Sequence, residues 1–230
     1  MPGKHSRNEV SYYPEIQTFI EAQLKSNFKA KRHKELSVFW GIGELKTNLQ
    51  RIIAEHPDKC TCVKNFANRV PPLNLDIFAL VTDGTQFEIL ILEVKLMNSA
   101  GLKEWSQLVG YCLVSGAKYG LLVNIDNGAS PRLAHILSTE AHISDIQTIV
   151  EGEHHEHCLG FMQWDSLTQT SVYKGYKQDK IEMRGDRAEM SDFPLYLNTV
   201  AGGLDCRDQT IGGFSFVVKI YAVPVIEIIG

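Results

Sequence analysis

The sequence has no long run of apolar residues. No stretch reaches the ~18 consecutive apolar residues that a membrane-spanning helix requires, and residues 1–20 lack the apolar segment of a secretory signal peptide. These absences favour a cytoplasmic protein that does not partner a membrane. Apolar residues make up 44% of the chain and charged residues 22%, which is typical of a folded globular protein and excludes a disordered one.

Cysteine is scarce, and its number is odd. A disulfide framework uses an even number of cysteines and belongs to small secreted domains, so we expect reduced thiols. The pair Cys60-x-Cys62 has no second pair at zinc-site spacing, and we therefore do not predict a zinc site there. The five cysteines are at positions 60, 62, 112, 158 and 206.

The chain also lacks an overall excess of positive charge. Its net charge is -4, yet residues 1–70 carry twelve Lys and Arg against seven Asp and Glu, and the remaining residues carry eleven against twenty. The basic character therefore lies in the N-terminal third. Within it, Lys29, Lys31 and Arg32 are candidate contacts to a DNA phosphate backbone. The alternative is a solvated helix end whose cations suit the helix dipole.

Neither an internal repeat nor a low-complexity linker divides the 230 residues, and this favours one domain, 1–230. Apolar residues at helical spacing predict helices, and β-branched runs predict strands. The predicted helices span 9–29, 44–56 and 101–118, the last with Gly116 near its end, and the predicted strands span 75–81, 86–96 and 119–126. The order of helix, hairpin, helix and strand predicts an α/β fold with a mixed central sheet flanked by helices.

Other parts of the chain give weaker patterns. Residues 60–70 are ambiguous, with a strand as one interpretation. Residues 130–150 favour a helix, and 151–165 favour a loop that leads into a strand. The alternating tail 212–229 predicts one or two strands bent near Pro224, so that the C-terminal part is rich in β-structure.

Two opposite charges interrupt the apolar strand predicted at 86–96. Glu93 and Lys95 both lie inside this run. Burying an ionised carboxylate or ammonium costs several kcal/mol unless the group is paired, binds a metal or lines a wet cleft. The two charges therefore indicate either a structural salt bridge or a functional site.

The turn that precedes this strand decides which other side chains share its face. Asp83-Gly84 is the dipeptide favoured in a two-residue hairpin turn. If the turn is centred there, residue n faces residue 167 minus n, and Asp76 lies opposite Ile91. Asp76 is then a diagonal neighbour of Glu93 on the same face, at a Cβ separation of about 7 Å, a gap that a divalent cation can bridge. A shift of register by one residue would remove this arrangement.

Asp76, sixteen intervening residues and Glu93-Val94-Lys95 resemble the signature of the PD-(D/E)XK nuclease superfamily. The predicted order of elements is similar to that family's α/β core over about residues 5–126, although "LNLD" stands where the family has Pro-Asp. The resemblance implies a Mg²⁺-dependent DNA endonuclease, with Mn²⁺ as a possible substitute and no organic cofactor. Asp76 and Glu93 would be the metal ligands, and Lys95 would position or activate water.

Gln107 and Tyr111 in "WSQLVGY" resemble the Gln-x-x-x-Tyr element of RecB-type members of the superfamily. A spacing of four puts them on one helical row with Lys103, a further candidate DNA contact. The alternative is an ordinary helix flank. The superfamily often adds an acid from the first helix, and Glu9 and Glu15 are both candidates. Glu9 is preferred because it shortly precedes Tyr-Pro.

A stand-alone chain without helicase or other motor motifs resembles, within this superfamily, a type II restriction endonuclease that acts as a homodimer. A structure-selective repair or recombination nuclease is the alternative, and a nuclease-like module that only binds nucleic acid is another. Residues 127–230 are then additions for DNA recognition or dimerisation. Lys174 and Lys177 in this part could contact phosphates, or they could belong to an exposed turn.

Four potential ligands of transition metals are crowded into five residues. They are His154, His155, His157 and Cys158. Adjacent side chains of a loop or strand cannot all turn to one ion, so we expect structural roles for them. A metal-dependent hydrolase centred on these histidines remains a weaker alternative.

Overall fold

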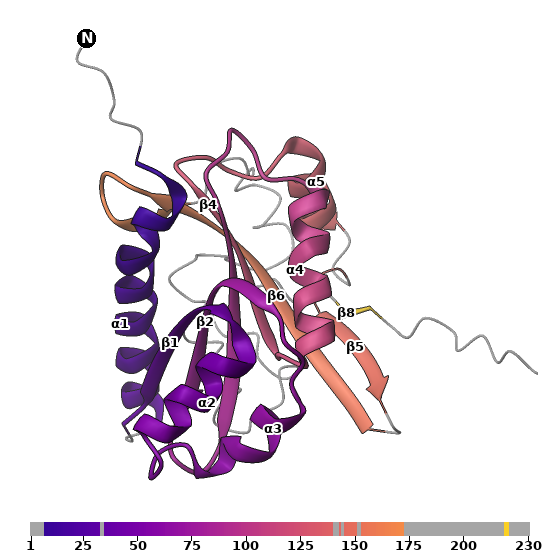
Figure 1. Ribbon diagram of the computed structural model, residues 1–230. Coiled ribbons are helices and arrows are strands. Elements are labelled where there is room, and N and C mark those ends of the chain that lie inside the picture. Colours follow the sequence, from indigo (N-terminus) through magenta and orange to yellow (C-terminus); the bar gives the residue numbers. More distant parts are fainter. Residues whose placement is uncertain are drawn as a thin grey trace, which may run out of the picture.

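The computed structural model describes residues 7–32, 35–139, 143, 145–150, 153–172 and 219–220. Eight strands of the described chain form one mixed sheet with helices on both faces (Figure 1). The strands are β1 (Ser37–Glu44), β2 (Asn74–Thr82), β3 (Phe87–Lys95), β4 (Tyr119–Ile125), β5 (Asp145–Val150), β6 (Glu153–Asp165), β7 (Thr170–Val172) and β8 (Lys219–Ile220). The helices are the 3₁₀ turn η1 (Glu9–Tyr12), α1 (Tyr13–Arg32), α2 (Leu45–Glu55), the 3₁₀ turn η2 (Thr61–Val63), α3 (Lys64–Arg69), α4 (Leu102–Ser115) and α5 (Pro131–Thr139).

The strand order is β1-β2-β3-β4-β6-β5-β8, and β7 pairs with β6. β2 is antiparallel to both of its neighbours, β1 and β3, whereas β3, β4 and β6 run parallel to one another. The carboxyl ends of β3, β4 and β6 therefore lie at one end of the sheet, together with the amino end of β2. In open α/β sheets this is the end at which ligands bind.

The two faces of the sheet carry separate hydrophobic cores. On one face α1 packs Ile16, Ile20 and Leu24 against β2, β3 and β4. On the other face α2, α3, α4 and α5 cover the sheet, with Leu49 and Trp105 among the buried residues. In Figure 1, α1 lies on one side of the strands, and α2, α3 and α4 lie on the other.

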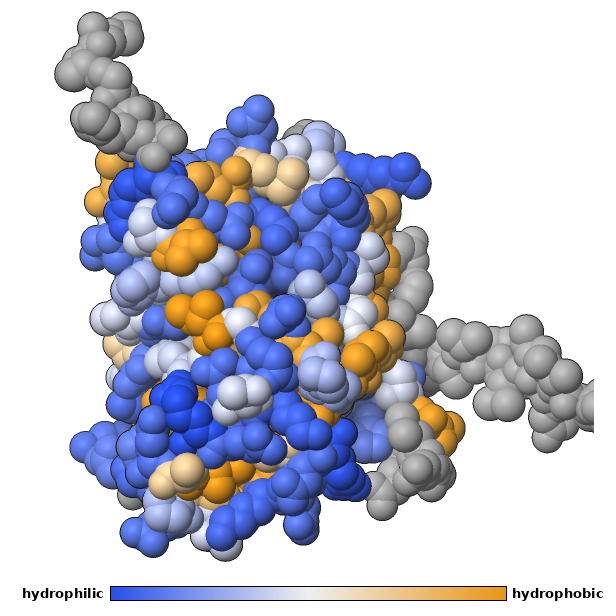
Figure 2. Space-filling view, in the orientation of Figure 1, coloured by the Kyte–Doolittle hydropathy of each residue, from blue (hydrophilic) through white to orange (hydrophobic). Residues whose placement is uncertain are grey.

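The face of the molecule shown in Figure 2 is mainly hydrophilic, with apolar groups scattered between the polar ones. Scattered exposed apolar residues are normal in a globular protein. Among the described helices, none has both the length and the apolar character needed to cross a bilayer.

The α/β class, the mixed sheet and its flanking helices are confirmed. So are the three predicted helices, the hairpin and the strand at 119–125. The helix α4 ends at Ser115, three residues before the predicted end at 118, because Gly116 follows it with a positive φ of 72°. The predicted tail strands at 212–229 lie outside the described residues except for the short β8.

The strand considered at 60–70 is wrong, and the predictions for 130–150 and 151–165 are confirmed only in part. The strand considered at 60–70 is η2 followed by α3, whose buried Val63 and Ala67 pack in the α4-side core. The helix expected over 130–150 stops at Thr139, and β-branched residues then form β5. The loop expected before the strand at 151–165 is itself strand, because β6 begins at Glu153 and pairs with β5.

The predicted hairpin register is wrong by two residues. Ile77 pairs with Leu92 and Thr82 with Phe87, so residue n faces residue 169 minus n. The loop has four residues, 83–86, because the Asp83 carboxylate accepts hydrogen bonds from the backbone of residues 85 and 86. Gly84 adopts a φ of 92° within it. Since the error is an even number, the predicted sharing of faces survives.

Candidate active site

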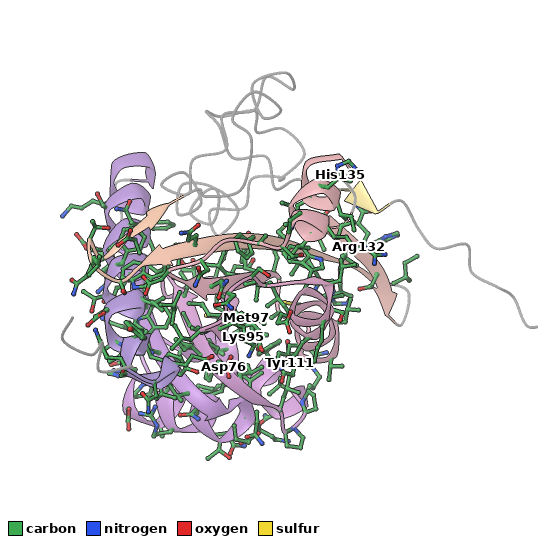
Figure 3. All side chains as sticks on the ribbon, turned by 90° about the horizontal axis from the view of Figure 1, so that it is seen from above. Asp76, Lys95, Met97, Tyr111, Arg132 and His135 are labelled. Carbon is green, nitrogen blue, oxygen red and sulfur yellow. The ribbon has the colours of Figure 1, made fainter. Side chains whose placement is uncertain are left out.

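Asp76, Glu93 and Lys95 meet at the end of the sheet where β3 stops. The Lys95 Nζ lies 3.3 Å from Asp76 Oδ2 and forms an ion pair with Glu93 Oε1. Asp76 Oδ2 also accepts a hydrogen bond of 3.0 Å from the Val94 backbone N–H. Figure 3 looks down on this end and shows Asp76 and Lys95 in the middle of the view, between α1 and α4. The lysine thus bridges the two carboxylates.

The pairing of β2 and β3 brings these side chains together. The pairing ends at Ile77 with Leu92, and extending this register by one residue sets Asp76 opposite Glu93, so the two are directly opposed and not diagonal as predicted. Their face is that of Phe78 and Ile91, which pack with α4. The alternate residues Leu90, Leu92 and Val94 are buried on the α1 side. Leu96 lies beyond the end of β3 and is 41% exposed.

Glu93 is the most deeply buried charge of the cluster. Its side chain is 1% exposed, whereas those of Lys95 and Asp76 are 22% and 27% exposed. Burial raises the pKa of Glu93 to about 7, the ion pair with Lys95 opposes this rise, and the charge of Asp76 adds to it. Glu93 Oε2 has no hydrogen-bond donor among the described residues. A buried carboxylate oxygen without a donor is costly, and it is available to a ligand.

Lys95 is a cation at neutral pH. Burial works against its charged form, but the hydrogen bond and charge of Glu93, with the charges of Asp76 and Glu9, outweigh burial and raise the pKa of Lys95. The cluster therefore contains a fixed positive charge next to two acids. This arrangement favours an electrostatic role for the lysine over that of a general base.

Glu9 joins this cluster from the opposite layer. It lies on η1, at the start of the α1 layer, and its Oε2 accepts a hydrogen bond of 3.2 Å from the Leu96 backbone N–H. Burial raises the pKa of Glu9; the charge of Lys95 lowers it and that of Asp76 raises it, so all three groups are within electrostatic reach. Glu15, the other candidate, is instead paired with Arg7 at 2.9 Å.

Further side chains fix the backbone just after β3. The fully buried Asn124 accepts a hydrogen bond from Met97 N and donates to Met97 O and Gly128 O. Together with the contacts of Asp76 to Val94 N and Glu9 to Leu96 N, this holds the chain around Lys95 at three points. Asn124 was not among the predicted residues, because an asparagine at the end of an apolar strand has no distinctive pattern.

The residues present suit a hard divalent cation. Carboxylate oxygens are the ligands that Mg²⁺ prefers, and Mg²⁺ usually keeps several waters and binds one or two carboxylates. Asp76 and Glu93 supply such oxygens, with Glu93 Oε2 still without a donor among the described residues. No three His, Cys, Asp or Glu side chains of the described chain converge tightly enough to enclose an ion by themselves. The fit is therefore to a two-carboxylate site completed by water or substrate.

Gln107 and Tyr111 form a hydrogen-bonded pair on α4. Gln107 Nε2 donates to the Tyr111 hydroxyl oxygen over 2.9 Å. Both side chains are partly exposed, and α4 covers the sheet face that carries Asp76 and Glu93. In the view of Figure 3, Tyr111 lies on the α4 side of Asp76. Lys103, one turn earlier, is exposed.

Three of the other predicted DNA contacts lie on α1. Lys29 is exposed on α1 and forms an ion pair of 2.9 Å with Glu35. Lys31 and Arg32 belong to the last turn of α1. Lys174 and Lys177 lie outside the described residues.

The histidine cluster does not converge on one point. Successive residues of β6 alternate between the faces of the sheet, so His154 and His155 point to opposite sides. The buried His157 has both ring nitrogens occupied, by Ala117 O at 2.7 Å and Thr148 Oγ1 at 3.2 Å, and burial lowers its pKa. Cys158 is buried as well. This geometry fits the structural roles that the sequence favours.

A scan against protein-family models found no matching family, and searches of the curated proteins and of the solved structures found no match. The function of the chain must therefore be inferred from the groups at the end of β3.

Proposed function

We propose that this protein is a Mg²⁺-dependent DNA endonuclease of the PD-(D/E)XK type. One observation carries the proposal: the Asp76 and Glu93 carboxylates and the Lys95 cation meet at one end of the sheet. Two acids and a lysine in this arrangement suit the hydrolysis of a phosphodiester, whose transition state gains negative charge.

The arrangement of the surrounding elements supports this class. A helix, α1, precedes the antiparallel strands β1, β2 and β3, and α4 then leads to β4, which is parallel to β3. The superfamily core has the same helix, hairpin, helix and strand. The short insertion of α2 and α3 between β1 and β2 lies in the same layer as α4 and leaves this pairing intact.

Each side chain has a role in the proposed reaction. Asp76 and Glu93 would hold Mg²⁺, which when bound supplies positive charge and an acidified water. Lys95, kept protonated by its acidic neighbours, donates hydrogen bonds to the phosphate and offsets its charge. Glu9 adds a third carboxylate at the edge of the cluster.

The Gln107–Tyr111 pair suits contact with the substrate. Because the Tyr111 oxygen accepts from Gln107, its own proton remains available for donation to a phosphate or a base. Lys103, exposed on the preceding turn, is placed on the same row for a phosphate contact.

The pattern of cleavage distinguishes the finer classes. Discrete fragments from duplex DNA would identify a type II restriction enzyme, for which we expect a homodimer. Preference for branched or flapped DNA would identify a structure-selective repair or recombination nuclease. Binding without cleavage would leave a nuclease-like module that only binds nucleic acid.

The test incubates the protein with plasmid, linear and branched DNA, with Mg²⁺ or with EDTA. We compare the wild type with Asp76→Ala and Lys95→Ala. Matched controls are Asp58→Ala and Lys64→Ala, which remove the same charges from exposed positions between and on the helices α2 and α3.

We expect cleavage that requires Mg²⁺, is retained by both controls and falls by about 10²- to 10⁴-fold in each cluster variant. Circular dichroism and thermal unfolding check that all variants are folded. Absence of Mg²⁺-dependent cleavage on every substrate, or cleavage undiminished in both cluster variants, would overturn the proposal.

A further inference from the structure

A buried tyrosine links α1 to the end of β3 through Glu9. The Tyr13 hydroxyl donates a hydrogen bond of 3.2 Å to Glu9 Oε1, while Glu9 Oε2 accepts from the Leu96 backbone N–H over 3.2 Å. Tyr13 is the first residue of α1 and is 3% exposed. The chain of contacts therefore runs from the α1 core to the residue that follows Lys95.

These two contacts fix the orientation of the Glu9 carboxylate. Among the described residues each oxygen has one donor, and a carboxylate accepts about four hydrogen bonds in total. Each oxygen of Glu9 therefore keeps a further lone pair, which can face a metal-bound or phosphate-bound water. Without both donors the side chain could rotate about its three torsions toward solvent.

A donor is needed here because Glu9 faces other negative charges. Asp76 and Glu93 belong to the same cluster, and Lys95 is shared between those two carboxylates. Like charges repel one another in a partly buried site. A fixed hydroxyl donor next to Glu9 offsets this repulsion without adding a second cation that would compete with a metal.

We infer that Tyr13 is a positioning residue that holds Glu9 in the cluster, so that a third carboxylate faces the waters of a metal held by Asp76 and Glu93. This inference rests on the proposed function for its consequence in catalysis. The position of Glu9 itself can be tested in the metal-free protein.

The neighbouring tyrosine provides a matched control. Tyr12 is also buried, but its ring lies 4.1 Å below the Arg7 guanidinium, and no hydrogen bond joins its hydroxyl to a described residue. Tyr12→Phe and Tyr13→Phe each remove one hydroxyl from adjacent buried positions. A difference between them therefore reports on the contact with Glu9.

The experiment compares the wild type, Tyr13→Phe and Tyr12→Phe in two measurements. The first is the hydrogen-exchange rate of the Leu96 amide without metal, since Glu9 is its hydrogen-bond acceptor. The second is the affinity for Mn²⁺ by titration. We expect Tyr13→Phe to speed Leu96 exchange several-fold and to weaken Mn²⁺ binding about tenfold, as loss of a hydrogen-bonding group outside the metal's own ligands does. Tyr12→Phe should match the wild type in both.

A double-mutant cycle separates positioning from general structure. In Glu9→Ala, adding Tyr13→Phe should produce no further change in either measurement, because the tyrosine acts through Glu9. The inference is overturned if Tyr13→Phe behaves as Tyr12→Phe does, or if its effect persists undiminished in Glu9→Ala. A wild type that binds no Mn²⁺ and cleaves no DNA would refute the proposed function, and Leu96 exchange would still decide whether Tyr13 holds Glu9.

Discussion

Two glutamates on β3, Glu88 and Glu93, both have a raised pKa but differ in the charged groups that surround them. Burial raises the pKa of each to about 7. Glu93 contacts Lys95 and lies opposite Asp76, on the face covered by α4. Glu88 lies on the other face, near the start of the strand, and no hydrogen bond or ion pair joins it to a described residue. The charge of Lys118 opposes the rise in its pKa.

The comparison shows what distinguishes a functional site from a single, partly buried carboxylate. A raised pKa reports only that a carboxylate has lost water, and it occurs at both positions. What is particular to Glu93 is the convergence of groups from β2, β3 and η1 at the end of the sheet. Glu88 is therefore the natural control for every claim made about Glu93.

The largest expected effect is on catalysis. Glu93→Gln should reduce Mg²⁺-dependent DNA cleavage by about 10³-fold, because it removes a ligand of a metal whose charge stabilisation is worth several kcal/mol. Glu88→Gln, the same change on the same strand, should stay within about twofold of the wild type. Single-turnover rates on a labelled duplex measure both. Equal losses in the two variants would remove the distinction between the glutamates.

The next effect is on stability. Lys95→Met should lower the free energy of unfolding by about 3 kcal/mol at pH 8, since it leaves Glu93 buried without its partner. The pKa of Glu93 is raised from 4.5 to about 7, so between these pH values the folded protein binds a proton that the unfolded chain has lost. The stability that this proton contributes is lost as the pH rises to about 7. The loss in Lys95→Met should therefore be smaller at pH 6.

Urea unfolding at pH 6 and pH 8 measures this prediction. The control Lys25→Met breaks the exposed pair with Glu21 and should change stability by no more than about 0.5 kcal/mol. A loss in Lys95→Met that is larger at pH 6 than at pH 8 would show that the lysine does not stabilise ionised Glu93.

A smaller effect concerns the pH dependence of metal binding. A protonated Glu93 cannot ligate, so the affinity for Mn²⁺ should fall by about tenfold per pH unit below pH 7 and level off above it. Glu88→Gln should keep this dependence, whereas Glu93→Gln should bind weakly at every pH. Calorimetric titration between pH 5.5 and 8.5 measures the affinity for Mn²⁺. If the affinity of Glu93→Gln still depended on pH in this way, the titrating group would not be Glu93.

The smallest effect is expected at the edge of the cluster. Lys103→Ala should weaken binding to any duplex only a few-fold and reduce the slope of log affinity against log salt by about one, as the loss of one phosphate contact does. Lys25→Ala, which removes a lysine already paired with Glu21, should leave the slope unchanged. Fluorescence anisotropy at several salt concentrations, in Ca²⁺ to prevent cleavage, measures both slopes.

The sequence was sufficient to predict that the side chains of the cluster share one face of the sheet, but not to predict the register in which β2 pairs with β3. The alternation of residues along β2 and β3 fixes which side chains lie together, and this survives an even error in the turn. The Asp83-Gly84 dipeptide suggested a two-residue turn. The observed loop is longer because the Asp83 carboxylate caps two backbone N–H groups and the Thr82 hydroxyl bonds Gln86 O, side-chain contacts that a dipeptide preference does not include.

The strand β1 escaped prediction because its pattern is broken by glycines. Gly41 and Gly43 flank an irregularity in its pairing with β2. A Cβ at Gly41 would come within 2.2 Å of the Phe78 ring, so the glycine permits close approach of β2. The position of such a strand is set by packing against its neighbour and not by alternating apolar and polar residues. Periodicity in the sequence therefore cannot detect it.

Part of the candidate site was also hidden in the sequence. Tyr13 fits the apolar stripe of α1, and a residue that belongs to the core gives no signal of a second role. The one clue was its spacing of four from Glu9, which brings the two onto one side of the chain where η1 continues into α1. The contact of Glu9 with Leu96 joins positions that are far apart in the chain, and only the fold could show it.

The most direct test of the central claim locates the metal. Crystals grown with Mn²⁺ should show an anomalous diffraction peak bonded to oxygens of both Asp76 and Glu93 at about 2.0–2.3 Å, and the same crystals of Glu88→Gln should show it unchanged. A peak at the histidines of β6, or Mn²⁺-dependent cleavage in a protein that shows no peak between Asp76 and Glu93, would contradict the account.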